Sequence, residues 1–75
     1  MIIKLRGVRK IHITGEYIRL DALLKYASLV STGGEAKYLI QNGEVFVDNE
    51  TCTQRGRKIT AGCVVRCNDD TLIVA

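Results

Sequence analysis

Apolar residues recur at helical spacing in the first half of the chain. Four of them follow the i, i+3, i+4, i+7 rule that marks one face of a helix: Leu20, Leu23, Leu24 and Ala27. Residues at this spacing form a stripe that turns toward a protein core. The pattern predicts an amphipathic helix from Asp21 to about Leu29, with Asp21, or Arg19 just before it, marking its start.

Capping signals on both sides of another apolar stripe indicate a second helix. Residues 32–35 fit the capping-box pattern, in which Thr32 caps the first turn and Glu35 reaches back to the Thr32 amide. The apolar stripe has three members: Ala36, Leu39 and Ile40. Gly43 then ends the helix as a left-handed residue. Lys37 and Tyr38 are left facing outward or sideways.

Beyond the second helix, the spacing of apolar residues becomes alternating. Val45 and Val47 share one face of a strand, Asp48-Asn49 turns the chain, and residues 51–53 return it. This is the pattern of a β-hairpin. Later turns and strands are expected at four places: a turn at 61–62, a strand at 63–67, a turn at 68–70 and a strand at 72–74.

The N-terminal segment also alternates, with Val8, Ile11 and Ile13 among basic or polar neighbours. Part of residues 1–14 is expected to form an edge strand, because Lys and Arg discourage pairing with other chains, and Gly15 ends it. Two helices followed mostly by strands predict an α+β fold. Both helices are expected to cover a small, mostly antiparallel sheet with hairpins.

The length and composition of the chain indicate one small soluble domain. The chain has 75 residues, of which 47% are apolar and 25% charged, and its mean hydropathy is +0.07. Its longest apolar run is far below the ~20 residues of a membrane helix, and residues 1–15 lack the apolar core of a secretory signal. We therefore expect a cytoplasmic protein with no membrane partner.

The three cysteines point to the same compartment. An odd number of cysteines without an export signal favours free thiols in a reducing environment. Cys63 and Cys67 lie about 13 Å apart along one strand, too far for a disulfide or for two ligands of one zinc ion. They are interpreted as packing residues. Cys52 keeps a redox or metal role open if its strand pairs with theirs.

Catalytic chemistry has little support in the sequence. His12, the one histidine, lies between Ile11 and Ile13 and is expected to point away from the core without a catalytic partner. The adjacent Asp69 and Asp70 are typical of a turn rather than of a carboxylate pair. No nucleophile, nucleotide or metal motif is recognisable. We expect no enzymatic activity, cofactor, metal ion or small-molecule substrate.

Two basic features suggest an anionic partner. Arg55, Arg57 and Lys58 lie close together around Gly56, in a chain of formal net charge +3. A solvated surface explains such a cluster equally well when it is considered alone.

The second feature is the start of the second helix. There the Gly33-Gly34 amides and the helix dipole favour a phosphate, with Lys37 one turn further on. A tight helix-helix turn capped by Glu35 is the competing interpretation, and an outward-facing Glu35 would repel a phosphate.

From about Tyr17 to Cys67 the order of these elements resembles the S-four RNA-binding domain, also called the alpha-L motif. The matching stretches are Arg19-Leu20-Asp21-x-x-Leu24, Ser31-Thr32-Gly33-Gly34-Glu35-Ala36-Lys37, Leu39-Ile40-x-x-Gly43-x-Val45-x-Val47-Asp48 and Arg55-Gly56-Arg57-Lys58-Ile59-x-x-Gly62. The series covers about two thirds of the chain. It looks like a small stand-alone bacterial member, although many members carry Ser-Arg where this chain has Thr-Gly-Gly-Glu.

The resemblance implies binding to structured RNA, usually ribosomal or transfer RNA, through the two-helix unit and the adjoining loop. The implied contacts are Thr32, Gly33, Gly34, Lys37, Arg55, Arg57 and Lys58. Recognition of folded RNA by shape needs phosphate contacts more than a base-reading code. Tyr26 and Tyr38 are candidates for stacking on bases, but their places beside the helix stripes favour packing. Lys25 and the cations at 4, 6, 9 and 10 extend the basic area or solubilise an edge.

These inferences lead to one functional hypothesis. The chain is expected to be a single RNA-binding domain with an N-terminal strand extension at 1–16, an alpha-L core at 17–67 and a C-terminal strand at 68–75. Its basic face would dock onto the backbone of structured RNA, with ribosomal RNA as the preferred ligand in this hypothesis and the ribosomal subunit as a further partner. The alternatives are a module that binds an acidic protein and an accessory subunit of an RNA-modifying enzyme.

Overall fold

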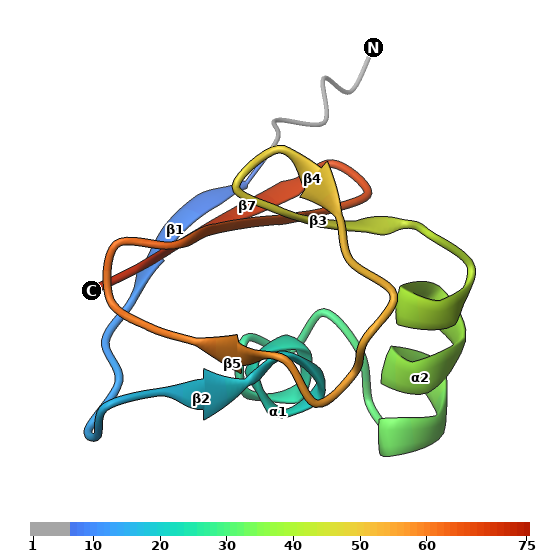
Figure 1. Ribbon diagram of the computed structural model, residues 1–75, viewed down its shortest axis with the longest axis horizontal. Helices are drawn as coiled ribbons and strands as arrows, with labels where there is room; N and C mark the ends of the chain where they lie inside the picture. Colours follow the sequence, from blue (N-terminus) through green and yellow to red (C-terminus); the bar gives the residue numbers. More distant parts are fainter. Residues whose placement is uncertain (1–6) are drawn as a thin grey trace, which may run out of the picture.

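A computed structural model describes residues 7–75 of the chain (Figure 1). The expected strand segment at 1–6, with Lys4 and Arg6, lies outside the described residues. The two helices are α1 (Leu20–Tyr26) and α2 (Gly33–Gln41). The strands are β1 (Val8–Ile11), β2 (Ile18–Arg19), β3 (Val45–Val47), β4 (Glu50–Thr51), β5 (Lys58–Ile59), β6 (Val64–Cys67) and β7 (Asp70–Val74). Within residues 7–75, neither helix is long and apolar enough to cross a membrane.

Five of the strands form one sheet in the order β1-β7-β6-β3-β4. All neighbours in it are antiparallel except β1 and β7, which run parallel. β1 lies at one edge, as expected from its basic residues, but it ends at Ile11, before the predicted stop at Gly15. The α+β class and the mostly antiparallel sheet are confirmed.

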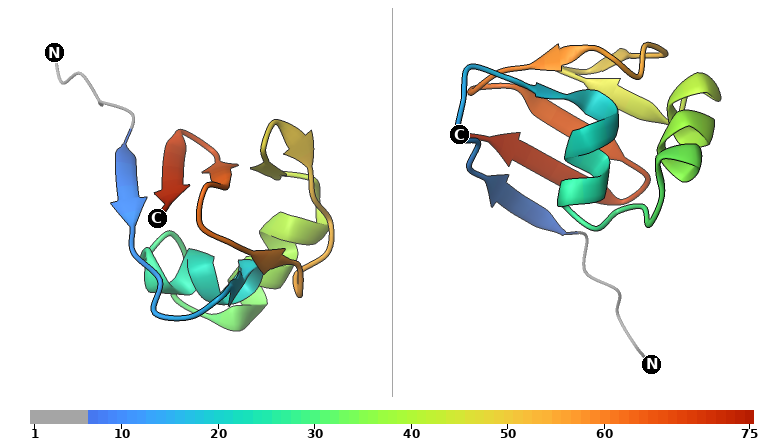
Figure 2. Two further views of the ribbon diagram at one scale, coloured as in Figure 1. Left: turned by 60° about the vertical axis from the view of Figure 1, so that its left-hand side comes forward. Right: turned by 90° about the horizontal axis from the view of Figure 1, so that it is seen from below.

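The molecule has two layers around one apolar core. α1 lies across one face of the five-stranded sheet, whereas α2 stands beside the end of the sheet where β3 begins (Figures 1 and 2). The expectation that both helices cover the sheet was therefore wrong for α2. The predicted stripes face this core: Leu20, Leu23, Leu24, Ala27, Ala36 and Ile40 are buried and Leu39 is half-buried. They pack against the inner sheet face, whose buried residues are Ile11, Val45, Val47, Val65, Cys67, Leu72 and Val74.

α1 is shorter than predicted. Its C-cap is Ala27, and Ser28 takes a left-handed backbone conformation with a φ of 60°. A right-handed helix cannot continue through such a residue. The Leu29 amide instead donates to the Leu24 carbonyl at 3.0 Å, so that Leu29 packs against the core from outside the helix.

α2 begins as the capping pattern predicts, with one change of partner. The Glu35 amide donates to Thr32 Oγ1 at 3.1 Å. The Glu35 carboxylate accepts from the amide of Ser31, not of Thr32 as predicted, at 3.2 Å. Gly43 has a φ of 76° and follows the end of the helix, which confirms the left-handed stop.

The β3–β4 hairpin turns at Asp48 and Asn49, whose φ angles are 50° and 69°. Two consecutive left-handed residues are the requirement of a type I′ turn, which suits the twist of the paired strands. The Asp48 carboxylate also accepts from the Val64 amide at 2.9 Å and so links the turn to β6. The return strand is shorter than expected, because β4 ends at Thr51.

A second, two-stranded sheet was not predicted. β2 and β5 pair antiparallel, with Ile18 opposite Ile59 and Arg19 opposite Lys58. The sequence interpretation placed Lys58 in a loop and Arg19 at a helix start, because strands of two residues are too short to show an alternating pattern. This small sheet lies in the layer of α1 and positions much of the candidate site (Figure 1).

Candidate nucleic-acid interface

The basic loop is tied to the start of α1 by backbone hydrogen bonds. The Arg57 amide donates to the Gln54 carbonyl at 3.1 Å and closes a turn. The Leu20 amide donates to the Arg57 carbonyl at 2.9 Å, and the Asp21 amide donates to the Arg55 carbonyl at 3.0 Å. Together with the pairing of β2 and β5, these bonds hold the loop beside the helix start.

Arg19 joins the predicted cations of the loop. It lies opposite Lys58 in the β2–β5 pair, and its guanidinium is 3.5 Å from the point where a Cβ on Gly56 would stand. Its side chain is 55% exposed, and Nη2 is 3.2 Å from the Asp21 carboxylate. The sequence analysis named Arg19 at the helix start and in the S-four resemblance but not among the RNA contacts, since its proximity to the loop depends on a strand pair that leaves no local pattern.

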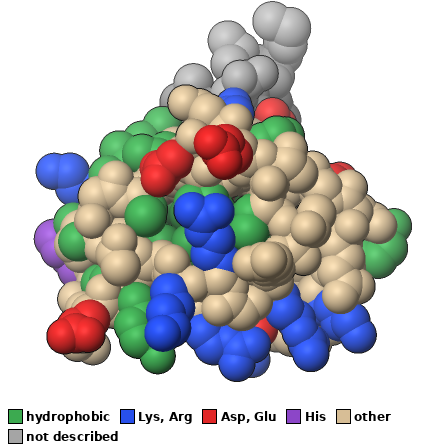
Figure 3. Space-filling model, in the orientation of Figure 1, with side chains coloured by type: hydrophobic (Ala, Val, Ile, Leu, Met, Phe, Trp, Pro, Cys, Tyr) green, Lys and Arg blue, Asp and Glu red, His purple; other side chains and the backbone are tan. Residues whose placement is uncertain are grey.

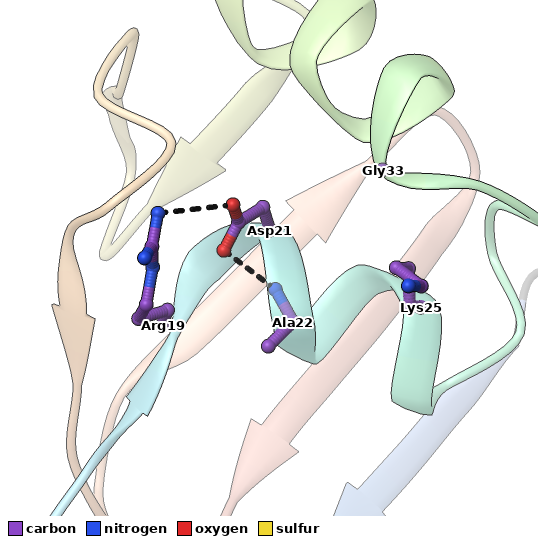
Figure 4. Close-up of a pocket in the computed structure, with 5 residues that line it drawn as sticks. All are labelled: Arg19, Asp21, Ala22, Lys25 and Gly33. Atoms are coloured by element: carbon purple, nitrogen blue, oxygen red, sulfur yellow. Dashed lines mark hydrogen bonds and ion pairs between the residues drawn. The ribbon is translucent and has the colours of Figure 1, made fainter.

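A pocket connects this cluster with the start of α2. It is lined by Arg19, Asp21, Ala22, Lys25 and Gly33, with a volume of about 250 Å³ (Figure 4). Gly33, from the predicted start of α2, thus shares a pocket with Arg19, which lies beside the loop. Lys25, named in the sequence analysis only as a possible extension, lines the same pocket.

At the α2 start, the predicted residues differ in what they offer a ligand. Thr32 Oγ1 is engaged in capping the helix. A Cβ added at Gly33 would meet no side chain or other segment within 4 Å, so Gly33 faces open space beside the pocket. A Cβ added at Gly34 would meet Thr32 Oγ1 at 3.8 Å. Lys37 is exposed and, four residues after Gly33, lies on the same face of the helix.

We call the resulting set of cations the basic surface. Its members are Arg19, Lys25, Lys37, Arg55, Arg57 and Lys58. Figure 3 shows Lys and Arg side chains gathered along the edge of the molecule where β2, β5 and α1 lie. Two carboxylates near these cations have partners: Asp21 pairs with Arg19, and Glu35 accepts from the Ser31 amide. The Glu35 carboxylate is therefore turned back toward its own helix start.

Three tyrosines are exposed around this region. Lys58 Nζ lies 4.9 Å from the ring centroid of Tyr17, a cation–π distance. Tyr26 is 64% exposed and Tyr38 is 65% exposed, so the packing interpretation of both was wrong. Each lies outside the buried stripe of its helix.

The remaining N-terminal cations serve different roles. Arg9 donates a hydrogen bond to the Ala27 carbonyl and so joins β1 to the end of α1. Lys10 alternates with buried Ile11 on β1, and its side chain is exposed on the other side of the strand. Neither belongs to the basic surface.

The cysteines and carboxylates behave as structural residues. Cys52 and Cys67 are buried, Cys63 is half-buried, and all three are free thiols. Burial raises the pKa of the Cys67 thiol above its ordinary value of 9.0, and Glu44 and Asp70 raise it further. The chain turns at residues 68–69 as predicted, but Asp70, which was expected in the turn, begins β7 and pairs with Cys67. Across residues 7–75, no group of three or more His, Cys, Asp or Glu side chains is placed to hold a metal ion.

Comparison with known proteins identifies the family to which this arrangement belongs. The model of the S4 domain matches residues 11–75. The chain belongs to the S4 domain family. It is also 42% identical over 55 residues to a protein of Bacillus subtilis (strain 168) named as the probable ribosome maturation protein RlbA. That alignment spans 73% of this chain and 78% of the relative. Membership of the S4 family agrees with the resemblance seen in the sequence and with an RNA-binding role.

Proposed function

We propose that this S4 domain is a non-catalytic protein that docks its basic surface onto the phosphate backbone of structured RNA. The observation that carries the proposal is the continuity of this surface, which runs from the Arg55–Lys58 loop past Arg19 and Lys25 to Gly33. Phosphate contacts position a protein on folded RNA and do not require a base-reading code.

Within this proposal, α1, α2 and the Arg55–Lys58 loop form the alpha-L contact unit. The Gly33 and Gly34 amides face a phosphate at the positive end of the α2 dipole, with Lys37 one turn away. Thr32 acts through its cap, which holds the first turn of α2 in place. The unit belongs to one RNA-binding domain over residues 1–75, with an alpha-L core at 17–67 flanked by an N-terminal strand extension and a C-terminal strand.

Ribosomal RNA is the RNA that we propose for this surface. The name of the Bacillus subtilis relative, a probable ribosome maturation protein, supports a ribosome-related partner for this chain as well. The ribosomal subunit offers folded RNA with closely spaced phosphates, which suits a surface of clustered cations. A cytoplasmic location follows from such a partner.

Replacing Lys58 by alanine tests the phosphate role. We expect the variant to bind purified ribosomal RNA about tenfold more weakly, because hydrogen bonds to charged groups contribute about 1.5–3 kcal/mol. The loss should be equal for RNA fragments that share a fold and differ in sequence, since phosphates carry no sequence information. Filter binding or fluorescence anisotropy measures both effects.

Lys10→Ala is the matched control, because Lys10 is also an exposed lysine on a short strand but lies outside the basic surface. It should bind as the unchanged protein does. An equal loss in both variants, or a Lys58→Ala loss confined to one RNA sequence, would contradict the proposal.

A further inference from the structure

A second pocket lies beside Tyr26, the last residue of α1. It is lined by His12, Ile13, Thr14, Ile18 and Tyr26 and has a volume of about 240 Å³. The connection between β1 and β2 forms one wall, and the last residue of α1 supplies the Tyr26 ring. No feature of the proposed phosphate contact uses these residues.

The pocket adjoins two elements that carry cations of the basic surface, α1 with Lys25 and β2 with Arg19. Tyr26 follows Lys25, and it lies four residues after Ala22, on the same face of α1. Ala22 and Lys25 line the pocket at Gly33, so the exposed side of this helix connects the two pockets. On the opposite wall, Ile18 precedes Arg19 in β2. A strand of RNA on the cations would therefore pass within reach of the Tyr26 ring.

The lining suits a flat aromatic group with polar edges. Ile13 and Ile18 supply apolar walls, and the exposed Tyr26 ring supplies a stacking surface. The Thr14 hydroxyl and the His12 imidazole supply groups that donate or accept hydrogen bonds. The volume is below the roughly 300–1,000 Å³ of pockets for drug-sized ligands, which favours a smaller planar group.

We infer that this pocket receives an unpaired base of the RNA, stacked on Tyr26. The inference rests on the proposed function, because the phosphates on the basic surface bring the base to the pocket. Unpaired bases in loops and bulges splay out of RNA helices and stack on aromatic side chains. Lys25, beside Tyr26, is placed for the phosphate next to that base.

Affinity measurements on tyrosine variants test this inference with purified ribosomal RNA as the probe. Tyr26→Ala should weaken binding at least about fivefold, since alanine substitution of a stacked aromatic costs ~1–3 kcal/mol per base. Tyr26→Phe keeps the ring and should stay within about twofold of the unchanged protein. The dependence of log affinity on log salt should keep its slope in Tyr26→Ala, because no phosphate contact is removed.

Tyr38→Ala is the matched control. Tyr38 is a tyrosine of nearly equal exposure, 65% against 64%, on the neighbouring helix, and it lines neither pocket. Its replacement should leave affinity unchanged. Unchanged binding by Tyr26→Ala, with the tenfold loss in Lys58→Ala present, would overturn the base pocket and leave the proposed function standing. Absence of RNA binding by the unchanged protein would overturn both.

Ultraviolet crosslinking locates the contact directly. Cleavage after Lys and Arg places Tyr17, Tyr26 and Tyr38 in three separate peptides, residues 11–19, 26–37 and 38–55. After irradiation of the complex with ribosomal RNA and nuclease digestion, mass spectrometry should find the nucleotide adduct on residues 26–37. Adducts confined to residues 38–55, or none on residues 26–37, would overturn the inference.

Discussion

Replacing Arg57 and Lys58 together by glutamate is expected to lower the affinity for ribosomal RNA at least about a hundredfold. Two charged contacts of about 1.5 kcal/mol or more each are lost, and every tenfold change in affinity corresponds to ~1.4 kcal/mol. The two carboxylates that replace them repel the phosphates. Arg57 lies on the loop that backbone hydrogen bonds hold beside α1, and Lys58 begins β5 directly after it, so the new charges remain at the interface.

A matched double variant distinguishes the loss of contacts at the basic surface from the effect of the lower net charge of the protein. Lys10→Glu with Arg66→Glu changes the net charge by the same amount. Arg66 is exposed and stacks on Phe46 in the five-stranded sheet, with its Cζ 5.1 Å from the ring centroid. This control should lose less than about tenfold, through the weaker long-range field alone. Equal losses in the two double variants would show that net charge, not the basic surface, governs binding.

Leu24→Ala is expected to reduce the free energy of unfolding by about 2–5 kcal/mol, the usual cost of truncating a buried leucine. Leu24 is 0% exposed and belongs to the stripe that anchors α1 on the sheet. Native domains are stable by only ~5–15 kcal/mol, and small ones tend to lie near the lower end. The loss should appear in urea unfolding as a lower midpoint.

Lys25→Ala is the control within the same helix. Its side chain is exposed, so stability should change by less than about 0.5 kcal/mol, while RNA affinity falls. The two variants thus separate the residue that holds α1 from the residue that faces the ligand. A Leu24→Ala loss below about 1 kcal/mol would contradict the packing of α1 described above.

The helices and the main hairpin could be predicted because their signals are local. The helical stripes predict the buried faces, Thr32 and Gly43 mark the ends of α2, and Asp48-Asn49 marks the turn after β3. The end of α1 was missed because its left-handed residue is Ser28, a residue type that does not signal this conformation. The left-handed residue after α2 is a glycine, Gly43, which does. The β2–β5 pair was missed because two-residue strands gain their stability from partners far away in the sequence.

In the candidate site, too, the residues in local runs could be predicted and those placed by long-range contacts could not. The Arg55–Lys58 cluster and the α2 start are visible in the sequence, because each is a compact run of residues. Arg19 and Lys25 lie outside both runs in the sequence, and their positions beside the site depend on strand pairing and on how α1 lies beside α2. Tyr26 was assigned to packing because it lies beside the apolar stripe of its helix. The helix ends at Tyr26, and the ring stays in solvent.

The salt dependence of binding tests the central claim most directly. With about three to five phosphate contacts, a plot of log affinity for purified ribosomal RNA against log salt should have a slope of about −2 to −4. Titrations between about 50 and 300 mM salt span the range in which counterion release dominates. A slope in that range, reduced by about one in Lys58→Ala, is the result that we predict. A flat line would contradict docking of the basic surface on RNA phosphates.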